Sequence, residues 1–393
     1  MKESRFKDTE VGLIPEDWQV DKIGNFATIT TGSQNTQDKV DNGKYPFYVR
    51  SQQIERINKF VFDTEGVVTA GDGVGTGKVF HYVKGRFGLH QRCYLMHNFN
   101  GVVPKYFYWS FSEYFYDRVM SMTAKSSVDS VRREMIFDMY LRLPKSQEEQ
   151  TRIASALTSI DNLISSLDKL IEKKKNIKQG TMQQLLTGKK RLKGFTEPWV
   201  EKRLSEIGDL GSGGTPSTFI PSYWNGNVNW LQSGAVQNCV IKQDAVKQTI
   251  SDEGLNHSAA YLMPKGTVLI AITGATCANI GYLTFESSAN QSVVGITCNE
   301  NNSGEFLYQK LLTERDNILS FKGGSAQSGV SLSNLRKLIV SIPTSKEEQS
   351  AIAFVLTSMD NEISALEAKK TKYEQIKQGM MQQLLTGKIR LIS

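Results

Sequence analysis

The sequence contains few of the residues that most enzymes use for catalysis. Only four histidines and four cysteines occur among its 393 residues. Cys93, Cys239, Cys277 and Cys298 form no CxxC pair, which argues against a zinc site or a disulfide framework. The HExxH, GxSxG and phosphate-loop motifs are absent, and so is an Asn/Asp-Pro-Pro-aromatic motif. We therefore assign no catalysis and no metal site to this chain.

Long apolar runs are missing as well. No stretch of eighteen apolar residues and no charged-then-apolar N-terminal segment occurs, so neither membrane insertion nor export is indicated, and we expect a cytoplasmic protein. The net charge of +7 and the isoelectric point near 9.0 suit a polyanionic partner, although many basic proteins bind no nucleic acid. A length of 393 residues predicts two or three domains.

The chain contains a nearly identical internal repeat. The segment 146–188, SQEEQTRIASALTSIDNLISSLDKLIEKKKNIKQGTMQQLLTG, returns as residues 345–387 with every number raised by 199. Between residues 176–192 and 375–391, fourteen of seventeen positions are identical. Trp18 and Trp199 occupy matching places near the start of each half. The chain is therefore a duplication.

Each copy of the repeat predicts one helix of about forty residues, which would span about 60 Å. Ser146 and Ser345 fit the N-cap, and Glu149 follows Ser146 by three residues, where a capping-box carboxylate returns to the N-cap amide. Gly188 and Gly387 fit the left-handed position that ends a helix. Apolar residues recur at alternating steps of four and three, as in a coiled-coil seam, at Ile153, Leu157, Ile160, Ile164, Leu167, Ile171, Ile352, Leu356, Met359, Ile363 and Leu366.

The repeat predicts the domain organisation. We expect globular parts at residues 1–145 and 189–344, and spacer helices at residues 146–188 and 345–393. The two helices would pack on each other in antiparallel orientation and hold the globular parts apart. Ordinary amphipathic helices of a large core remain the alternative.

The globular parts predict an α+β fold. Short β-branched and aromatic runs indicate strands at residues 45–49, 67–70, 79–83, 228–231, 268–272, 280–284 and 293–297, and helices are expected at 104–120 and 305–319. The stretch GDGVGTGK at residues 71–78 departs from a phosphate loop, since Asp72 replaces the first glycine and Val79 the hydroxyl residue, so it predicts a glycine-rich hairpin. The aromatic cluster at residues 106–116 is interpreted as core, with base stacking as the alternative.

Polar side chains near the predicted strands are candidates for contacts to DNA bases. Gln and Asn can pair bidentately with adenine, and Arg with guanine, in the major groove. A solvated surface explains any one of these residues equally well, and for the match of His90-Gln91-Arg92 with Asn290-Gln291-Ser292 structural hydrogen bonding is an equal alternative. The candidates are Arg50, Ser51, Gln52, Gln53, Arg56, His90, Gln91, Arg92, Gln232, Ser233, Gln237, Asn238, Asn290 and Gln291.

A polar loop precedes each long helix. Lys125, Arg132 and Arg133 in the first loop can contact phosphate, and Gln327 in the second can contact a base or phosphate. Flexible surface loops are the alternative. Lysines cluster at the end of the first helix, where a solvated face and a basic spacer beside a duplex are both consistent with the charge.

Taken together, the alternation of globular part and long helix, the helix ends QGTMQQLLTGK and QGMMQQLLTGK, and the segment GGTPS at residues 213–217 resemble the DNA-specificity subunit of type I restriction-modification systems. The resemblance covers essentially the whole chain, although the first half has TGSQNT where the second has GGTPS. It adds Thr215 and Ser217 to the candidate DNA contacts.

The resemblance implies that each globular part is a target recognition domain and that the helices form an antiparallel spacer. It implies that the chain binds double-stranded DNA, two methyltransferase subunits and restriction translocase subunits. S-adenosylmethionine and ATP with magnesium would belong to those partners, and the chain itself would bind no cofactor. Two other classes remain open, namely a nuclease or methyltransferase with an undetected active site and a scaffold that binds no DNA.

Overall fold

The structure is a computed structural model that describes residues 5–73, 75–122, 130–322 and 329–392. The chain divides into two compact units. The first unit contains residues 1–169 and 367–393, and the second contains residues 170–366. Each unit therefore combines one globular lobe with part of each long helix. We call residues 5–145 the first lobe and residues 189–344 the second lobe.

The first lobe is built on a six-stranded sheet with the strand order β4-β9-β7-β8-β5-β6. Its strands are β4 (Thr28–Thr31), β5 (Tyr45–Tyr48), β6 (Glu55–Ile57), β7 (Phe62–Ala70), β8 (Phe80–Leu89) and β9 (Cys93–His97). β7 and β8 pair in antiparallel register, which confirms the glycine-rich hairpin at residues 71–78. β5 pairs with β8 in parallel, so the chain enters β5 and β8 from the same side.

Helix α2 (Pro104–Ser121) supplies the core of this lobe and packs against β7 and β8. Tyr106, Phe107, Phe111 and Phe115 are fully buried, so the aromatic cluster is core, as the sequence predicted. The lobe also contains β1 (Phe6–Lys7), β2 (Ile14–Pro15), α1 (Ile23–Phe26), η1 (Thr36–Asp38) and α3 (Arg133–Phe137), and β3 (Trp18–Lys22) pairs antiparallel with β10 (Tyr140–Pro144).

The second lobe contains two sheets. A five-stranded sheet has the order β12-β19-β16-β17-β14, and a three-stranded sheet has the order β15-β13-β18. The strands are β12 (Gly208–Ser212), β13 (Trp224–Leu231), β14 (Cys239–Ile241), β15 (Gln248–Ile250), β16 (Val268–Ala271), β17 (Ile280–Leu283), β18 (Ser288–Ala289) and β19 (Val293–Cys298). The strands expected from the sequence in both lobes are thus confirmed, with ends shifted by a few residues.

Short helices and one further strand pair complete the second lobe. β11 (Trp199–Arg203) pairs antiparallel with β20 (Ile339–Pro343), as β3 pairs with β10 in the first lobe. The helices are α5 (Leu204–Ile207), α6 (Asp252–Asn256), α7 (Gly304–Leu312), α8 (Arg315–Ser320) and α9 (Leu332–Lys337), with 3-10 turns η2 (Pro221–Tyr223), η3 (Ser233–Ala235), η4 (Gln243–Ala245) and η5 (Gly274–Thr276). The single helix expected at residues 305–319 is wrong, because it is divided into α7 and α8.

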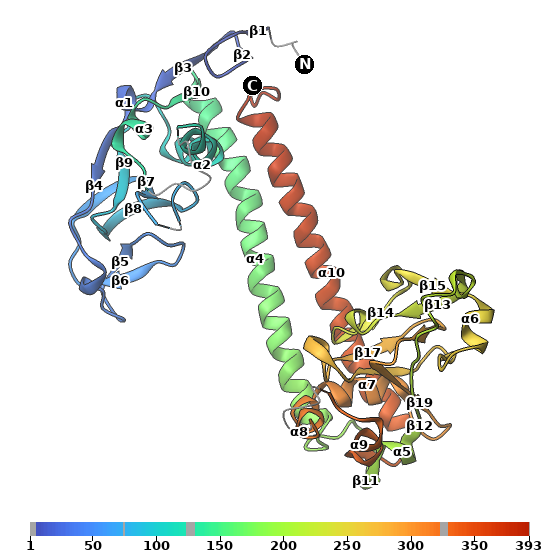
Figure 1. Cartoon of the computed structure of the whole chain (residues 1–393). Helices are drawn as coiled ribbons and strands as arrows, with labels where there is room; N and C mark the ends of the chain where they lie inside the picture. The colour runs from blue at the N-terminus through green and yellow to red at the C-terminus, as the bar shows by residue number, and fades with distance from the viewer. Residues whose placement is uncertain (1–4, 74, 123–129, 323–328, 393) are drawn as a thin grey trace. The chain divides into compact units, whose positions relative to one another are not determined.

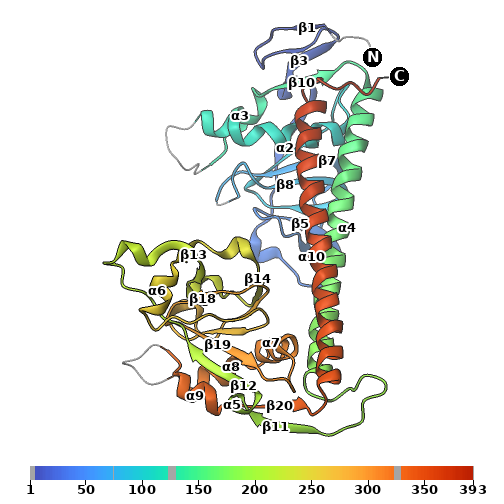
Figure 2. The same ribbon diagram turned by 90° about the vertical axis from the view of Figure 1, so that its right-hand side faces the viewer.

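The two long helices are α4 (Gln147–Leu185) and α10 (Lys346–Leu384), and parts of both lie side by side in each unit (Figures 1 and 2). In the first unit, Lys377 pairs with Asp161 at 2.5 Å and Lys370 with Asp168 at 2.6 Å, so the residue numbers rise on one helix as they fall on the other. This pattern shows that the helix segments are antiparallel.

The second unit has the same arrangement with the two copies exchanged. Lys178 pairs with Asp360 at 2.5 Å, and these residues are the counterparts of Lys377 and Asp161. The seam residues Leu157 and Leu356 are both fully buried. Matching contacts in the two units confirm an α+β chain with two long antiparallel helices and an internal pseudo-two-fold duplication.

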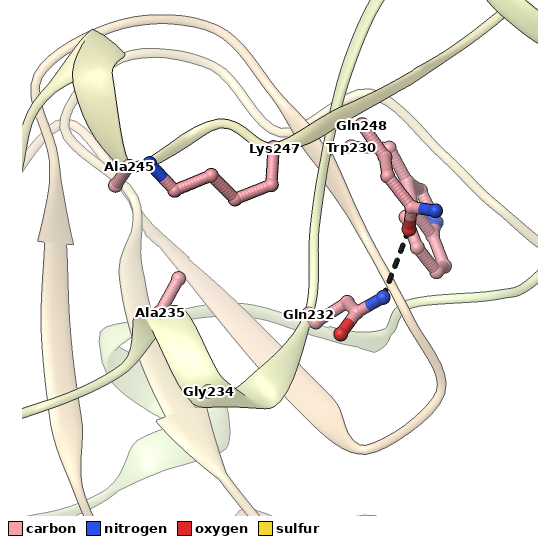
Figure 3. Close-up of a pocket in the computed structure, with 7 residues that line it drawn as sticks. All are labelled: Trp230, Gln232, Gly234, Ala235, Ala245, Lys247 and Gln248. Atoms are coloured by element: carbon pink, nitrogen blue, oxygen red, sulfur yellow. Dashed lines mark hydrogen bonds between the residues drawn. The ribbon is translucent and has the colours of Figure 1, made fainter.

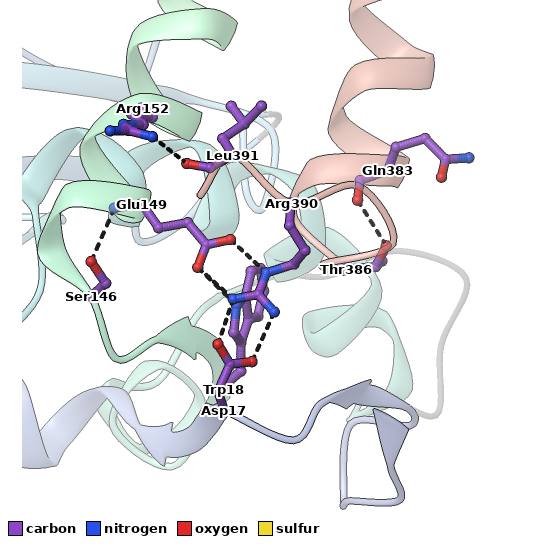
Figure 4. A network of polar contacts seen from close by, with 9 residues as sticks. All are labelled: Asp17, Trp18, Ser146, Glu149, Arg152, Gln383, Thr386, Arg390 and Leu391. Carbon is purple, nitrogen blue, oxygen red and sulfur yellow. Dashed lines mark hydrogen bonds and ion pairs between the residues drawn. The ribbon is translucent and has the colours of Figure 1, made fainter. Parts of the chain in front are cut away.

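A buried ion pair joins the two helix ends in each unit. In the first unit, Arg390 donates from Nε to Glu149 Oε1 at 2.6 Å and from Nη2 to Glu149 Oε2 at 2.8 Å (Figure 4). Arg390 also binds Asp17 with both Nη atoms, and Trp18 Nε1 donates to Glu149 at 3.3 Å. Arg191 binds Glu348 in the same way in the second unit, at 2.5 and 2.6 Å.

This ion pair corrects the capping-box prediction. The hydroxyl of Ser146 does accept a hydrogen bond from the Glu149 amide, at 3.4 Å, so the N-cap is present. The Glu149 carboxylate, however, turns to Arg390 instead of to the N-cap amide, because a buried carboxylate needs a charged partner. At the other end of the helices, Gly188 and Gly387 adopt φ angles of 70° and 71°, which confirms the left-handed stop.

Among the described residues, none of the helices combines the length and apolar character that crossing a bilayer requires.

Candidate nucleic-acid interface

Two of the predicted arginines meet at one carboxylate in the first lobe. Arg50 follows β5, Arg92 precedes β9, and Asp72 follows β7. Arg50 Nη1 lies 2.7 Å from Asp72 Oδ1, and Arg92 Nη1 lies 2.5 Å from Asp72 Oδ2. The arginine side chains are 43% and 62% exposed, whereas that of Asp72 is 14% exposed. The carboxylate is therefore at the base of a cationic cluster that faces solvent.

Electrostatics keep this carboxylate ionised. Burial raises the pKa of the Asp72 carboxyl, but hydrogen bonds from Arg50 and Arg92, together with their charges, outweigh burial and hold the pKa below its ordinary value. Asp72 thus carries a full negative charge at neutral pH. Two positive charges against one negative charge leave a net charge of one positive unit on the cluster.

The residues at positions 90 and 290 hold a turn in each lobe. His90 Nδ1 accepts a hydrogen bond from the Arg92 amide at 3.1 Å, and Asn290 Oδ1 accepts one from the Ser292 amide at 3.2 Å. His90 is 4% exposed. Burial, followed by the charge of Arg50, lowers the pKa of His90, which keeps its Nδ1 available as an acceptor. The structure therefore places both side chains in structural hydrogen bonds.

The glutamines that follow these residues are exposed and contact the loop after the first sheet strand. Gln91 Nε2 donates to Asn35 Oδ1 at 2.5 Å, and the Thr215 hydroxyl donates to Gln291 Oε1. Asn35 and Thr215 belong to the segments TGSQNT and SGGTPS, which begin alike and then diverge. Each lobe thus presents a glutamine with a polar neighbour, but the neighbour differs.

Three of the remaining candidates of the first lobe donate hydrogen bonds to backbone carbonyls. Gln52 Nε2 donates to Lys78 O at 3.1 Å, and the Ser51 hydroxyl donates to Gln53 O at 3.0 Å. Arg56 donates from Nε to Gly43 O at 2.9 Å and from Nη2 to Lys44 O at 3.0 Å. Two of its donors are therefore already used within the fold. Gln52 and Gln53 are exposed.

In the second lobe, a cavity of about 340 Å³ lies beside Gln232 (Figure 3). Gln232 Nε2 donates to Gln248 Oε1 at 2.8 Å, and the indole of Trp230 lies behind this pair. Ser233 follows Gln232 and begins η3. Among the described residues, neither glutamine side chain makes another hydrogen bond. Gln232 Oε1 therefore remains available as an acceptor and Gln248 Nε2 as a donor, and both residues are exposed.

Other candidates of the second lobe are exposed and make hydrogen bonds within the lobe. Asn238 adopts a φ of 56° and accepts a hydrogen bond from the Ile280 amide at 2.9 Å, and Gln237 Nε2 donates to Gly234 O at 2.9 Å. The Ser217 carbonyl accepts from Trp224 Nε1 at 3.1 Å. Asn238 in particular joins β14 to β17.

The loop candidates are partly described. Arg132 is the exposed residue before α3, and the Arg133 guanidinium lies 5.2 Å from the centre of the Phe137 ring. The Val131 amide donates to Gly71 O at 2.6 Å, so this loop reaches the cationic cluster at Asp72. Lys125 and Gln327 lie outside the described residues.

Sequence reasoning missed three polar or aromatic residues at these surfaces. Asp72 was treated only as a departure from a phosphate loop, and Gln248 gave no signal because its partner Gln232 is 16 residues away in sequence. Phe219, next to GGTPS, is 94% exposed. A single exposed aromatic side chain outside a helix or strand has no periodicity to reveal it. Within the described residues, no group of three His, Cys, Asp or Glu side chains is placed to hold a metal ion.

Comparison with known proteins gives one family. The family model described as the type I restriction modification DNA specificity domain matches residues 15–179 and again residues 196–378. The type I restriction enzyme MjaVIII specificity subunit of Methanocaldococcus jannaschii is 26% identical, over 99% of this chain and 97% of that protein.

Solved structures give the same fold. The S subunit of a type I restriction-modification system from M. genitalium superposes with a TM-score of 0.69 at 15% identity, over 93% of this chain and 96% of that one. A chain from a structure that describes complex assembly and conformational transition of the type I R-M system superposes with a TM-score of 0.54 at 12% identity, over 96% and 99%.

Proposed function

The chain belongs to the type I restriction-modification DNA specificity family, and we propose that it reads a bipartite DNA target, one half-site with each lobe. The observation that carries this proposal is the divergence of the exposed loops on a duplicated fold. Where the first lobe presents Arg50 and Arg92, the second presents Ser233 and Ser292. Two copies of one scaffold with different polar side chains suit two different half-sites.

The antiparallel helices are proposed to set the spacing between the half-sites. Half-site spacing follows protein geometry in dimeric DNA-binding proteins, and a duplicated chain is the covalent equivalent of a dimer. One heptad of helix measures about 10 Å, which corresponds to about three base pairs along a duplex. Helix length would then be part of the specificity of the protein.

Catalysis is proposed to belong to partner subunits. The chain would position two methyltransferase subunits, which bind S-adenosylmethionine, and restriction subunits, which use ATP and magnesium. The chain itself would bind neither cofactor and would carry out no reaction. Extraction and methylation of a base need a pocket with catalytic groups, which the methyltransferase subunits would supply.

Methylation mapping tests the proposal. The full chain, assembled with its methyltransferase subunits, should methylate DNA at one bipartite sequence, and binding should weaken as salt rises. Arg50→Ala should relax recognition in one half-site, and Gln291→Ala in the other. Equal loss in both half-sites from either variant, or methylation without sequence preference, contradicts the proposal.

A variant with longer helices tests whether the helices set the gap between the half-sites independently of the half-site sequences. Seven residues inserted at matched places in α4 and α10 preserve the apolar seam, because the seam repeats every seven residues. The half-site sequences should then stay unchanged while the gap between them grows by about three base pairs. Altered half-site sequences with an unchanged gap contradict the spacer role.

A further inference from the structure

The arginine cluster of the first lobe occupies a place that exists in both lobes. The Gly32 amide donates to Cys93 O, and the Gly213 amide donates to Val293 O. Position 92 therefore corresponds to position 292.

Two more backbone contacts extend the match. The amides of His90 and Asn290 donate to Tyr48 O and Leu231 O, so Arg50 corresponds to Ser233. The amides of Val131 and Val330 donate to Gly71 O and Ile272 O. Asp72, which follows Gly71, therefore corresponds to Thr273, which follows Ile272.

The fold of these loops does not require the charged cluster. The second lobe makes the same backbone hydrogen bonds with Ser233, Thr273 and Ser292 at the three positions. An exposed ion pair adds about 0–1 kcal/mol to stability, and that of Arg92 is 62% exposed on the arginine side. A structural role therefore does not explain why the first lobe has two arginines at these positions.

Asp72 fixes the positions of the two guanidinium groups and leaves most of their N–H donors unused. Each guanidinium gives one Nη1 donor to the shared carboxylate, at 2.7 and 2.5 Å, and has five N–H donors in total. Across the described part of the chain, neither guanidinium donates another hydrogen bond to protein. The remaining donors are held in a fixed direction, which lowers the entropy that is lost when they bind.

We propose that Arg92, with Arg50 beside it, reads a guanine in the half-site of the first lobe, and that Asp72 is the positioning residue. This inference rests on the proposed function. Guanine presents O6 and N7 as adjacent acceptors in the major groove, and the arginine fork matches them bidentately. A contact to phosphate is less suited to the cluster, because Asp72 cancels one of its positive charges and repels phosphate oxygens.

The test selects DNA sequences from a randomised duplex library with the full chain in its methyltransferase complex. The wild-type complex must first yield a bipartite motif, and failure at this step contradicts the proposed function itself. Arg92→Ala should then lower the preference for guanine at one position by about tenfold to a hundredfold. The other positions of that half-site and the whole of the other half-site should stay unchanged.

Two further variants separate reading from structure. Arg92→Lys keeps the charge and an ion pair with Asp72 but loses the fork, so affinity should persist while discrimination falls as in the alanine variant. Asp72→Asn should relax the same guanine position. Arg86→Ala is the control, because Arg86 is 56% exposed and pairs with Asp63 at 2.9 Å in the same hairpin. It should leave the motif unchanged.

Three results overturn the inference while leaving the proposed function standing. The first is a wild-type motif without guanine in either half-site. The second is a uniform loss of affinity in Arg92→Ala with an unchanged motif and a salt slope lower by about one, which indicates a phosphate contact. The third is an unchanged motif in all cluster variants.

Discussion

Removing Arg390 should unfold the helix ends of the first unit selectively. Arg390→Ala leaves the Glu149 carboxylate, 3% exposed, with the Trp18 indole at 3.3 Å as its remaining side-chain partner. Breaking a buried ion pair by removal of one partner costs about 3–5 kcal/mol, because the other charge stays buried and uncompensated. The bonds to Asp17 add at most about 1 kcal/mol, since its side chain is 63% exposed.

A double variant separates the burial of a charge from the loss of packing. In Glu149→Leu with Arg390→Met, both charges are absent and the apolar volume is largely kept. Replacing a whole buried ion pair by apolar residues is often neutral or stabilising. The double variant should therefore be more stable than Arg390→Ala by more than about 2 kcal/mol, although the Trp18 N–H loses its acceptor.

Hydrogen exchange followed by mass spectrometry measures the effect in each unit separately. Arg390→Ala should lower amide protection at the start of α4, residues 147–157, and leave the start of α10, residues 346–356, unchanged. Arg191→Ala should give the reverse pattern, because Arg191 binds Glu348 in the second unit. A loss below about 1 kcal/mol, or equal loss in both units, would refute the reasoning.

Two further predictions concern the turn at His90 and the helix stops. Burial lowers the pKa of His90 below its ordinary value of 6.5, so its contribution to stability is complete above about pH 6.5 and is lost as the pH falls through the folded pKa. His90→Asn should therefore flatten the decline in first-lobe stability between pH 7 and pH 5 in urea denaturation, and an unchanged decline contradicts this. Gly387→Ala should destabilise more than Gly188→Ala, because an added Cβ would lie 2.4 Å from Pro15 Cγ but 3.2 Å from the Trp199 ring. In both variants the alanine must adopt a positive φ, which costs about 1–2 kcal/mol of stability. Equal thermal midpoints of the two variants would contradict the steric argument.

The long helices were predictable because their signals are local. The apolar steps, the N-cap serines and the glycine stops all lie within one segment, and the structure confirms each of them. The role of Glu149 was not predictable in this way, because Arg390 is 241 residues away in sequence. A carboxylate three residues after a serine fits a capping box and a buried ion pair equally well until the partner is known.

The candidate interface was predictable only as a set of residue types. Arg50 and Arg92 were identified as candidates, but their link through Asp72 depends on the strand order, which places the ends of β5, β7 and β9 close together. His90 and Asn290 show the limit from the other side. The sequence left contact with bases and structural hydrogen bonding equally open for them, and in the structure each accepts a hydrogen bond from a backbone amide of its own turn.

The duplication separates the residues that maintain the fold from those that are free to differ. Glu149 and Glu348 are buried and each has an arginine partner, so a change of either alone leaves an uncompensated charge that costs several kcal/mol. Arg92 is exposed and its counterpart Ser292 is half-buried, and at such surface positions a substitution typically changes stability by less than about 0.5 kcal/mol. New binding preferences can therefore arise in the loops of one lobe while the helix ends keep both ion pairs. Under the proposed function, the stability cost of changing what a lobe binds is then small.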